Sequence, residues 1–173
     1  MTTRRQTIYL DMDGVLSDFM TRYRELNGDW KRDREGKKSQ AWHNFCTGGH
    51  FAGLDTWPGS AELLQFIEQI RRSRDINVEI LTSTGGAEYH ERVTADKQQW
   101  CEDHGIFYKV NTVPGRWIKQ NFCRRRDILI DDTADVIDQW RRRGGVGILH
   151  TSAEKTIDAL NSVLDFQSVL IYN

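Results

Sequence analysis

The sequence predicts an α/β fold for this 173-residue chain, with a mostly parallel sheet and helices on both faces. Apolar runs that suit buried strands alternate with longer segments that suit helices. Three of the apolar runs end in polar residues, namely Asp11-Met12-Asp13, Thr82-Ser83 and Asp131-Asp132. Because strands that alternate with helices run parallel, their carboxyl ends meet at one edge of the sheet. We therefore expect the functional residues at that edge.

Proline and glycine residues set the limits of several expected elements. Pro58 suits the first turn of a helix, and Gly105 and Gly144-Gly145 suit helix ends. Strands are expected at 7–11, 77–82, 107–110, 127–130 and 146–149. Helices are expected near 17–27, 59–73, 87–104, 114–122, 133–143 and 153–164. The apolar run 169–171 suits either a last short strand or a packing tail.

Residues 28–57 do not follow this alternation, because they are polar and irregular yet rich in aromatic side chains. The chain length fits one domain, residues 1–173, in which residues 28–57 form a small insertion after the first strand. The insertion holds Trp30, Trp42, Phe45, Phe51 and Trp57. Most of these side chains are expected to form the insertion's own small core.

The composition argues against several classes of protein. A formal net charge of −1 gives no general basic field, so we do not expect binding to long duplex nucleic acid. No apolar run approaches the roughly 18 residues that a membrane-spanning helix needs, and no signal peptide is recognisable. Three widely spaced cysteines, without a Cys-x-x-Cys pair, suit reduced thiols. A cytoplasmic location is expected.

The two acidic clusters predict one metal site between them. Gly14 lets the chain leave the first strand after Asp11 and Asp13, whose side chains would otherwise diverge. The second cluster, Asp131-Asp132, follows a strand of the same design. Oxygen ligands without a nearby histidine or cysteine favour Mg²⁺ over zinc. The alternative is a turn in which an aspartate caps a helix.

The third strand end suits a phosphate group. Thr82 and Ser83 offer hydroxyls, and the following Thr84-Gly85-Gly86 offers backbone N–H groups. The alternative is that the hydroxyls cap the helix that begins near Gly86. Lys119 is the candidate for a positive charge at the site, with a solvated surface lysine as the alternative. Lys97 and Lys109 compete for this role, although on spacing alone Lys97 suits an exposed helix position.

In their order, Asp11-x-Asp13-Gly14-Val15, Leu81-Thr82-Ser83, Lys119 and Asp131-Asp132 resemble the motifs of the haloacid dehalogenase (HAD) superfamily of phosphohydrolases. The closest resemblance is to the 5′(3′)-deoxyribonucleotidase group and related small phage and bacterial HAD proteins. The resemblance implies a three-layer Rossmann-like sheet with a small C1-type cap, here residues 28–57. Within the cap, one or two aromatic side chains would stack on a nucleobase or cover a sugar.

The resemblance also implies a role for each motif residue. Asp11 would be the nucleophile, and Asp13 the general acid and then the general base. Mg²⁺ would lie between Asp11, the backbone carbonyl of Asp13 and the Asp131-Asp132 pair, with Asp132 the direct ligand. Lys119 would place its charge on the nucleophile and phosphate. Lys97 resembles a substrate-binding lysine in a Lys-x-x-Trp motif, and Thr82 and Ser83 would bind the phosphate.

The implied activity is Mg²⁺-dependent hydrolysis of a phosphate monoester through an aspartyl-phosphate. The implied partner is a small phosphorylated substrate, foremost a nucleoside monophosphate. The insertion is short beside the cap of known deoxyribonucleotidases, which keeps a polynucleotide 3′-phosphatase or another small-metabolite phosphatase as alternatives. A non-catalytic phosphate-binding module is the alternative of another class, though Asp11 and Asp13 are both present. The oligomeric state is left open.

Overall fold

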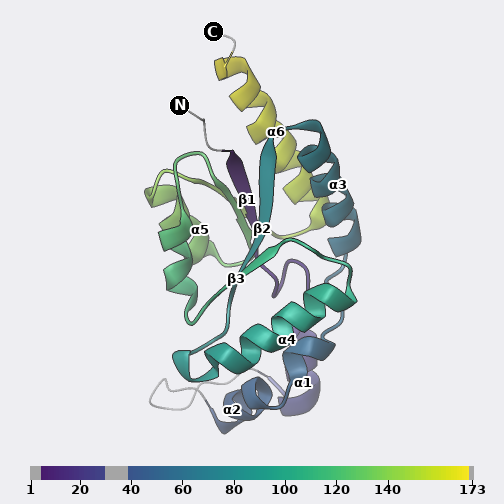
Figure 1. Cartoon of the computed structure of the whole chain (residues 1–173). Coiled ribbons are helices and arrows are strands. Elements are labelled where there is room, and N and C mark those ends of the chain that lie inside the picture. Colours follow the sequence, from purple (N-terminus) through teal and green to yellow (C-terminus); the bar gives the residue numbers. More distant parts are fainter. Residues whose placement is uncertain (1–4, 30–38, 172–173) are drawn as a thin grey trace.

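The computed structural model describes residues 5–29 and 39–171 and is built around one sheet of five parallel strands (Figure 1). Their spatial order is β3-β2-β1-β4-β5. The strands are β1 (Gln6–Leu10), β2 (Ile76–Ser83), β3 (Lys109–Val113), β4 (Ile128–Asp131) and β5 (Val146–Leu149). Because β1 lies between β2 and β4, the three strand ends that carry the expected polar residues are neighbours at one edge.

Helices cover both faces of the sheet, so the fold has the three layers that the motifs imply. In Figure 1, α5 lies on one side of the sheet, and α3 and α6 lie on the other. The α-helices are α1 (Phe19–Asn27), α2 (Gln40–Thr47), α3 (Ser60–Ser73), α4 (His90–Asp103), α5 (Ala134–Arg142) and α6 (Ala153–Ile171). The 3₁₀ helices are η1 (His50–Gly53), η2 (Ala87–Tyr89) and η3 (Arg116–Phe122).

The central strand shows why this sequence forms a two-sided sheet. Successive side chains of a strand point to opposite faces. Ile8 and Leu10 are fully buried in the larger core, which α3, α4 and α6 complete. Tyr9 points to the opposite face, where it packs edge-on against Trp140 of α5. An uninterrupted apolar run is therefore required in β1, as in other strands covered on both faces.

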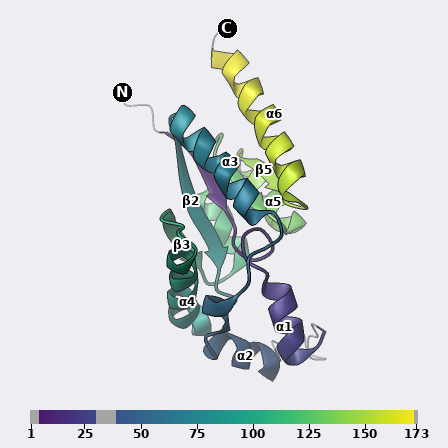
Figure 2. The same cartoon turned by 90° about the vertical axis from the view of Figure 1, so that its right-hand side faces the viewer.

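The segment between β1 and α3 lies beyond the carboxyl edge of the sheet (Figure 2). It contains α1, α2 and η1, and its aromatic side chains pack against one another. We call this group the aromatic cluster. Its members are Phe19, Tyr23, Trp42, Phe45 and Phe51. The expectation of a small core in this segment is consistent with the burial of Trp42, Phe45 and Phe51. Trp30 lies outside the described residues.

Several sequence-based expectations need correction. The expected irregular stretch contains the helices α2 and η1, although residues 30–38 of it lie outside the described residues. The run 169–171 is neither a strand nor a tail, because α6 continues through Ile171. The expected strand at 107–110 begins later, at Lys109. Apart from these corrections, two runs of three arginines, 124–126 and 141–143, precede β4 and β5 and lie at the amino edge of the sheet, away from the acidic residues.

Truncation of a core residue of α3 is expected to cost stability. Ile67 is fully buried against the sheet, so Ile67→Ala should lower the free energy of unfolding by about 2–5 kcal/mol. The control is Gln65→Ala on the exposed face of the same helix, which should change it by less than about 0.5 kcal/mol. Urea titration measures both. Equal effects of the two variants would contradict the described packing of α3.

Candidate active site

The chain makes a tight loop immediately after β1. Asp11 follows the last strand residue, and its backbone N–H donates to the carbonyl of Ile130 in β4 at 3.0 Å. Gly14 has a φ of 76°, and a Cβ at this position would lie 2.3 Å from a carboxylate oxygen of Asp132. Glycine is therefore required at position 14 for two reasons: the positive φ of the backbone and the close approach of Asp132. The loop brings the first acidic cluster against the second.

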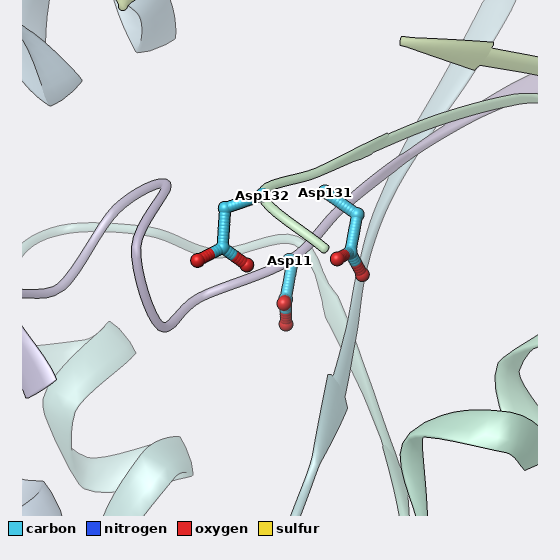
Figure 3. A group of neighbouring side chains, drawn as sticks. All are labelled: Asp11, Asp131 and Asp132. Carbon is cyan, nitrogen blue, oxygen red and sulfur yellow. The ribbon is translucent and has the colours of Figure 1, made fainter. Parts of the chain in front are cut away.

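Three carboxylates converge at this edge of the sheet. Asp11, Asp131 and Asp132 each offer one oxygen, and these oxygens lie within 4.8 Å of one another (Figure 3). We call these three residues the acid cluster. Lys119 of η3 lies beside it, with Nζ 2.8 Å from Asp11 Oδ1 and 2.6 Å from Asp131 Oδ2. Its side chain is almost completely buried, so one cation inside the protein faces three carboxylates.

The charges in the acid cluster shift one another's pKa values. Burial lowers the pKa of Lys119, but the carboxylates of Asp11 and Asp131 outweigh it and hold the pKa above its ordinary value. Burial and then the charge of Asp11 raise the pKa of Asp131. Asp132 is exposed at its surface, but partial loss of water around its carboxylate, followed by the charges of Asp11 and Asp131, raises its pKa to about 7. Lys119 alone therefore does not compensate the negative charge of the acid cluster.

The acid cluster fits a divalent cation. Asp11 Oδ1 accepts hydrogen bonds from Lys119 and from the backbone N–H of Met12, and both oxygens of Asp131 have partners. Within the described residues, Asp11 Oδ2 and Asp132 Oδ2 have no hydrogen-bond donor. Two free carboxylate oxygens beside an excess of negative charge are the donor set that a hard cation such as Mg²⁺ prefers.

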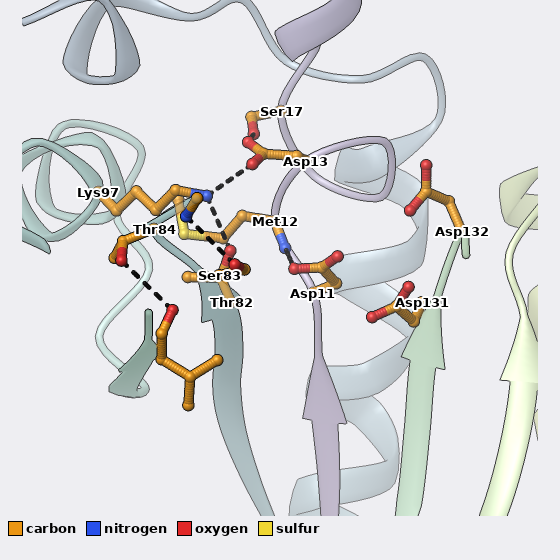
Figure 4. Close-up of polar contacts among 12 residues, drawn as sticks. Asp11, Met12, Asp13, Ser17, Thr82, Ser83, Thr84, Lys97, Asp131 and Asp132 are labelled. Carbon is orange, nitrogen blue, oxygen red and sulfur yellow. Dashed lines mark hydrogen bonds and ion pairs between the residues drawn. The ribbon is translucent and has the colours of Figure 1, made fainter. Parts of the chain in front are cut away.

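Asp13 belongs to a second polar group, on the other side of the loop (Figure 4). Lys97 Nζ donates to Asp13 Oδ2 at 2.7 Å and to Thr82 Oγ1 at 2.8 Å. Ser17 donates to the other oxygen of Asp13. The ring of Phe51 covers Lys97 Nζ at 5.0 Å from the ring centroid. Asp11 and Asp13 thus each face a lysine of their own, rather than one shared partner.

The lysines are placed differently from the spacing-based expectation. Lys97 is fully buried in α4 instead of exposed, because its ammonium group reaches Asp13 and Thr82 across the core. Lys119, the favoured candidate, contacts the acid cluster. Lys109 contacts neither Asp13 nor the acid cluster. It begins β3 at the amino edge of the sheet, is exposed and approaches Glu79. The structure therefore brings two of the three candidate lysines to the site.

The last residues of β2 and the loop that follows them form one wall of the site. The hydroxyl of Thr82 is buried and faces Lys97, whereas Ser83 lines the cavity and accepts the backbone N–H of Gly85. Neither hydroxyl caps the following helices, for which no side-chain cap bond is present. A Cβ at Gly85 would lie 2.2 Å from the ring of Trp42, so the aromatic cluster packs directly on this loop.

A cavity of about 1050 Å³ opens over these residues. Asp11, Asp13, Asp132 and Lys119 line it, as do residues of α1, α2 and η1 on one side and Pro114–Ile118 on another. Sequence reasoning did not single out the segment 114–118. Its only signal was a tryptophan, Trp117, two residues before the candidate lysine.

Two further polar side chains, those of His150 and Asp135, contact other residues of the protein and do not line the cavity. His150 is buried, and its ring nitrogen lies 2.9 Å from the hydroxyl of Thr156, as a structural histidine would. Asp135, in the first turn of α5 after the Asp131-Asp132 pair, forms an ion pair with Arg116 at 3.1 Å. Both side chains of that pair are more than half exposed, so it contributes little to stability.

Comparison with solved structures identifies the fold. The structure is similar to that of D,D-heptose 1,7-bisphosphate phosphatase from Burkholderia thailandensis, with 10% identity and a TM-score of 0.50 over 95% of this chain and 99% of that one. It is also similar to the putative HAD-hydrolase YfnB from Bacillus subtilis bound to magnesium, with 14% identity and a TM-score of 0.49 over 85% and 87% of the two chains. A search of curated protein sequences returned no significant match.

A comparison with protein families identifies the group. The family described as "5′ nucleotidase, deoxy (Pyrimidine), cytosolic type C protein" matches residues 5–169, which is nearly the whole chain. The match includes β1, the acid cluster and both buried lysines. The sheet order and the motifs agree with it, so the resemblance to HAD phosphohydrolases is confirmed. The chain therefore belongs to this deoxyribonucleotidase family and is a HAD-type phosphatase.

Proposed function

We propose that this protein is a Mg²⁺-dependent phosphomonoesterase that hydrolyses deoxyribonucleoside monophosphates through an aspartyl-phosphate on Asp11. The observation that carries the proposal is the environment of Asp11. Lys119 and the N–H of Met12 hold one of its carboxylate oxygens, and the other oxygen is free beside an open cavity. A carboxylate fixed in this way presents one oxygen to a substrate in a defined direction.

The reaction would proceed in two displacements. Asp11 Oδ2 forms a bond to phosphorus, the bond from phosphorus to the ester oxygen breaks, and Asp13 gives a proton to the departing alkoxide. Asp13 then takes a proton from a water molecule whose oxygen attacks the same phosphorus. The bond from Asp11 to phosphorus breaks and inorganic phosphate leaves.

Two cations of the chain would neutralise the phosphate. Lys119 reduces the repulsion between Asp11 and the incoming phosphate oxygens. Lys97 is fully buried and does not line the cavity, so its charge would act on the phosphate through Asp13 and Thr82, to which it donates. Ser83 and the backbone of Gly85 and Gly86 line the cavity and would bind the remaining oxygens.

Asp11 and Asp132 would hold Mg²⁺ together with the backbone carbonyl of Asp13, and Asp131 would orient Lys119 beside them. Bound there, Mg²⁺ supplies positive charge that offsets repulsion between the nucleophile and the phosphate.

The segment 28–57 would act as a cap that excludes water from the site. Among the described residues, no helix is long and apolar enough to cross a membrane. We also propose a cytoplasmic location, because the description of the matching family is of a cytosolic protein.

A larger phosphate is the second candidate substrate. The cavity of about 1050 Å³ lies at the upper end of the usual range for small-molecule sites, so it admits more than a phosphate and a sugar. A polynucleotide 3′-phosphate is less favoured, because both arginine triplets lie at the opposite edge of the sheet.

The test of the proposed function is phosphate release from 5′- and 3′-mononucleotides, sugar phosphates and a 3′-phosphorylated oligonucleotide, with Mg²⁺ and with EDTA. Release from none of these would contradict the proposal.

Replacement of the nucleophile should abolish turnover without unfolding the protein. Asp11→Asn keeps the shape of the side chain but removes its charge, so kcat should fall by at least about 10³-fold. Asp138→Asn, an exposed carboxylate of α5 outside the cavity, is the matched control and should keep wild-type kcat. Circular dichroism checks the fold of both. Substantial activity in Asp11→Asn would exclude Asp11 as the nucleophile.

Metal binding should depend on pH through Asp132. In the metal-free protein its pKa is raised to about 7, above the unfolded value, so its contribution to stability falls as pH rises from about 4 to 7. Mg²⁺ needs the ionised form. At about 100 times its dissociation constant, Mg²⁺ should raise the melting temperature by roughly 5–10 °C near pH 8, and by much less near pH 5.5.

The same thermal measurement on Asp132→Asn separates this effect from general ionic stabilisation. The variant lacks one free carboxylate oxygen, so most of the Mg²⁺-dependent shift near pH 8 should disappear. Asp138→Asn should retain it. A shift that is independent of pH, or one that persists in Asp132→Asn, would show that the acid cluster is not the metal site.

A further inference from the structure

Trp117 exposes its ring inside the cavity of the candidate active site. Among the described residues, the large hydrophobic side chains that remain exposed are Leu26, Phe107, Trp117 and Leu149. Of these four, Trp117 lines the cavity, and 61% of its surface is accessible. An indole exposed within a binding cavity, instead of on an outer surface, has apolar area available for a ligand.

The position of Trp117 is set by its neighbours. It lies in η3, and the backbone N–H of Ile118 donates to the carbonyl of Gly115 at 2.9 Å, which closes the turn around it. A Cβ at Gly115 would lie 2.7 Å from Trp117 Nε1, so the indole packs against the bare backbone of glycine. The ring is thus supported by Gly115, and more than half of the residue's surface remains accessible.

Trp117 is also close in the sequence to the lysine that marks the proposed phosphate position. Trp117 is two residues from Lys119, so their Cα atoms are at most about 7 Å apart. Lys119 contacts Asp11, the proposed nucleophile. In a mononucleotide the sugar separates the base from the phosphate. When the phosphate lies at Asp11, the base would therefore lie further away, near the wall of the cavity. Trp117 forms part of that wall.

The aromatic cluster is less available for this role. Trp42 and Phe51 are buried, and their rings pack edge-on against each other. Phe51 additionally covers Lys97, and Trp42 packs on Gly85. Phe19 is partly buried and stacks on Phe51. A base could stack between these rings only if existing contacts separated, whereas the ring of Trp117 needs no rearrangement.

We propose that Trp117, which is not part of the aromatic cluster, forms a stacking subsite for the nucleobase of the substrate. This proposal rests on the proposed function and adds the residue that distinguishes a nucleotide from a sugar phosphate. Stacking uses the flat face that every base has, so the subsite favours nucleotides over phosphates without a base, with little preference among bases.

The test compares a deoxyribonucleoside 5′-monophosphate with deoxyribose 5-phosphate, which lacks the base. The measured quantity is the ratio of kcat/KM for the two substrates. Trp117→Ala should lower this ratio by on the order of tenfold, whereas Trp117→Phe, which retains a ring, should lower it much less. The control is Phe107→Ala: Phe107 is the other exposed ring, 85% accessible and outside the cavity.

Nucleotide binding, measured by calorimetry on the same variants with Mg²⁺, provides a second readout that does not need turnover. Weaker binding to Trp117→Ala than to Trp117→Phe would support the subsite. An unchanged ratio and unchanged affinity in Trp117→Ala would overturn it, while nucleotide hydrolysis itself would leave the proposed function standing. Hydrolysis of sugar phosphates but not of nucleotides would overturn both.

Discussion

The site depends on one buried cation, Lys119, held between the carboxylates of two adjacent strands. Asp11 follows β1 and Asp131 ends β4, and each would repel the other without the ammonium group between them. Both strand ends are fixed in place by the parallel pairing of β1 with β4. Because a buried charge is tolerated only when it is paired, loss of Lys119 would leave the carboxylates of Asp11 and Asp131 facing each other without a cation. The geometry of Asp11 is thus a consequence of the balance of charge.

The aromatic cluster links the segment beyond β1 to the same chemistry. Phe51 covers the ammonium group of Lys97, which holds Asp13, and Trp42 packs on Gly85 in the loop proposed to bind phosphate. A cation over an aromatic ring is stabilised most when both are removed from water, as Lys97 is here. The cluster's packing and the orientation of Asp13 are therefore physically coupled, although they come from distant parts of the sequence.

Features that depend on local sequence could be predicted, and features that depend on packing could not. The alternating apolar runs located the strands to within a few residues, and Gly14 marked the loop that brings Asp11 to Asp132. The burial of Lys97 could not be foreseen, because its partners Asp13 and Thr82 are remote in sequence. Helix α2 was missed because polar residues surround it in the sequence, although Trp42, Phe45 and Cys46 have helical spacing and Ser39 caps the first turn.

The position of Trp117 was likewise beyond sequence reasoning, because a single tryptophan has no periodicity that separates a cavity wall from a core. The motif order, in contrast, was sufficient for the family, since four motifs in one order constrain a sequence far more than one does. Local chemistry thus identified the class of reaction, and the tertiary structure identified which neighbours tune it.

The most direct test of this account is to look for the covalent intermediate. Rapid acid quenching during turnover of a nucleotide, followed by proteolysis and mass spectrometry, locates any phosphoryl group on the chain. The account predicts a phosphorylated peptide that contains Asp11, formed within the first turnover and lost on treatment with hydroxylamine, as an acyl phosphate would be. A phosphoryl group on another residue, or none during demonstrable turnover, would contradict the assignment of Asp11 as nucleophile.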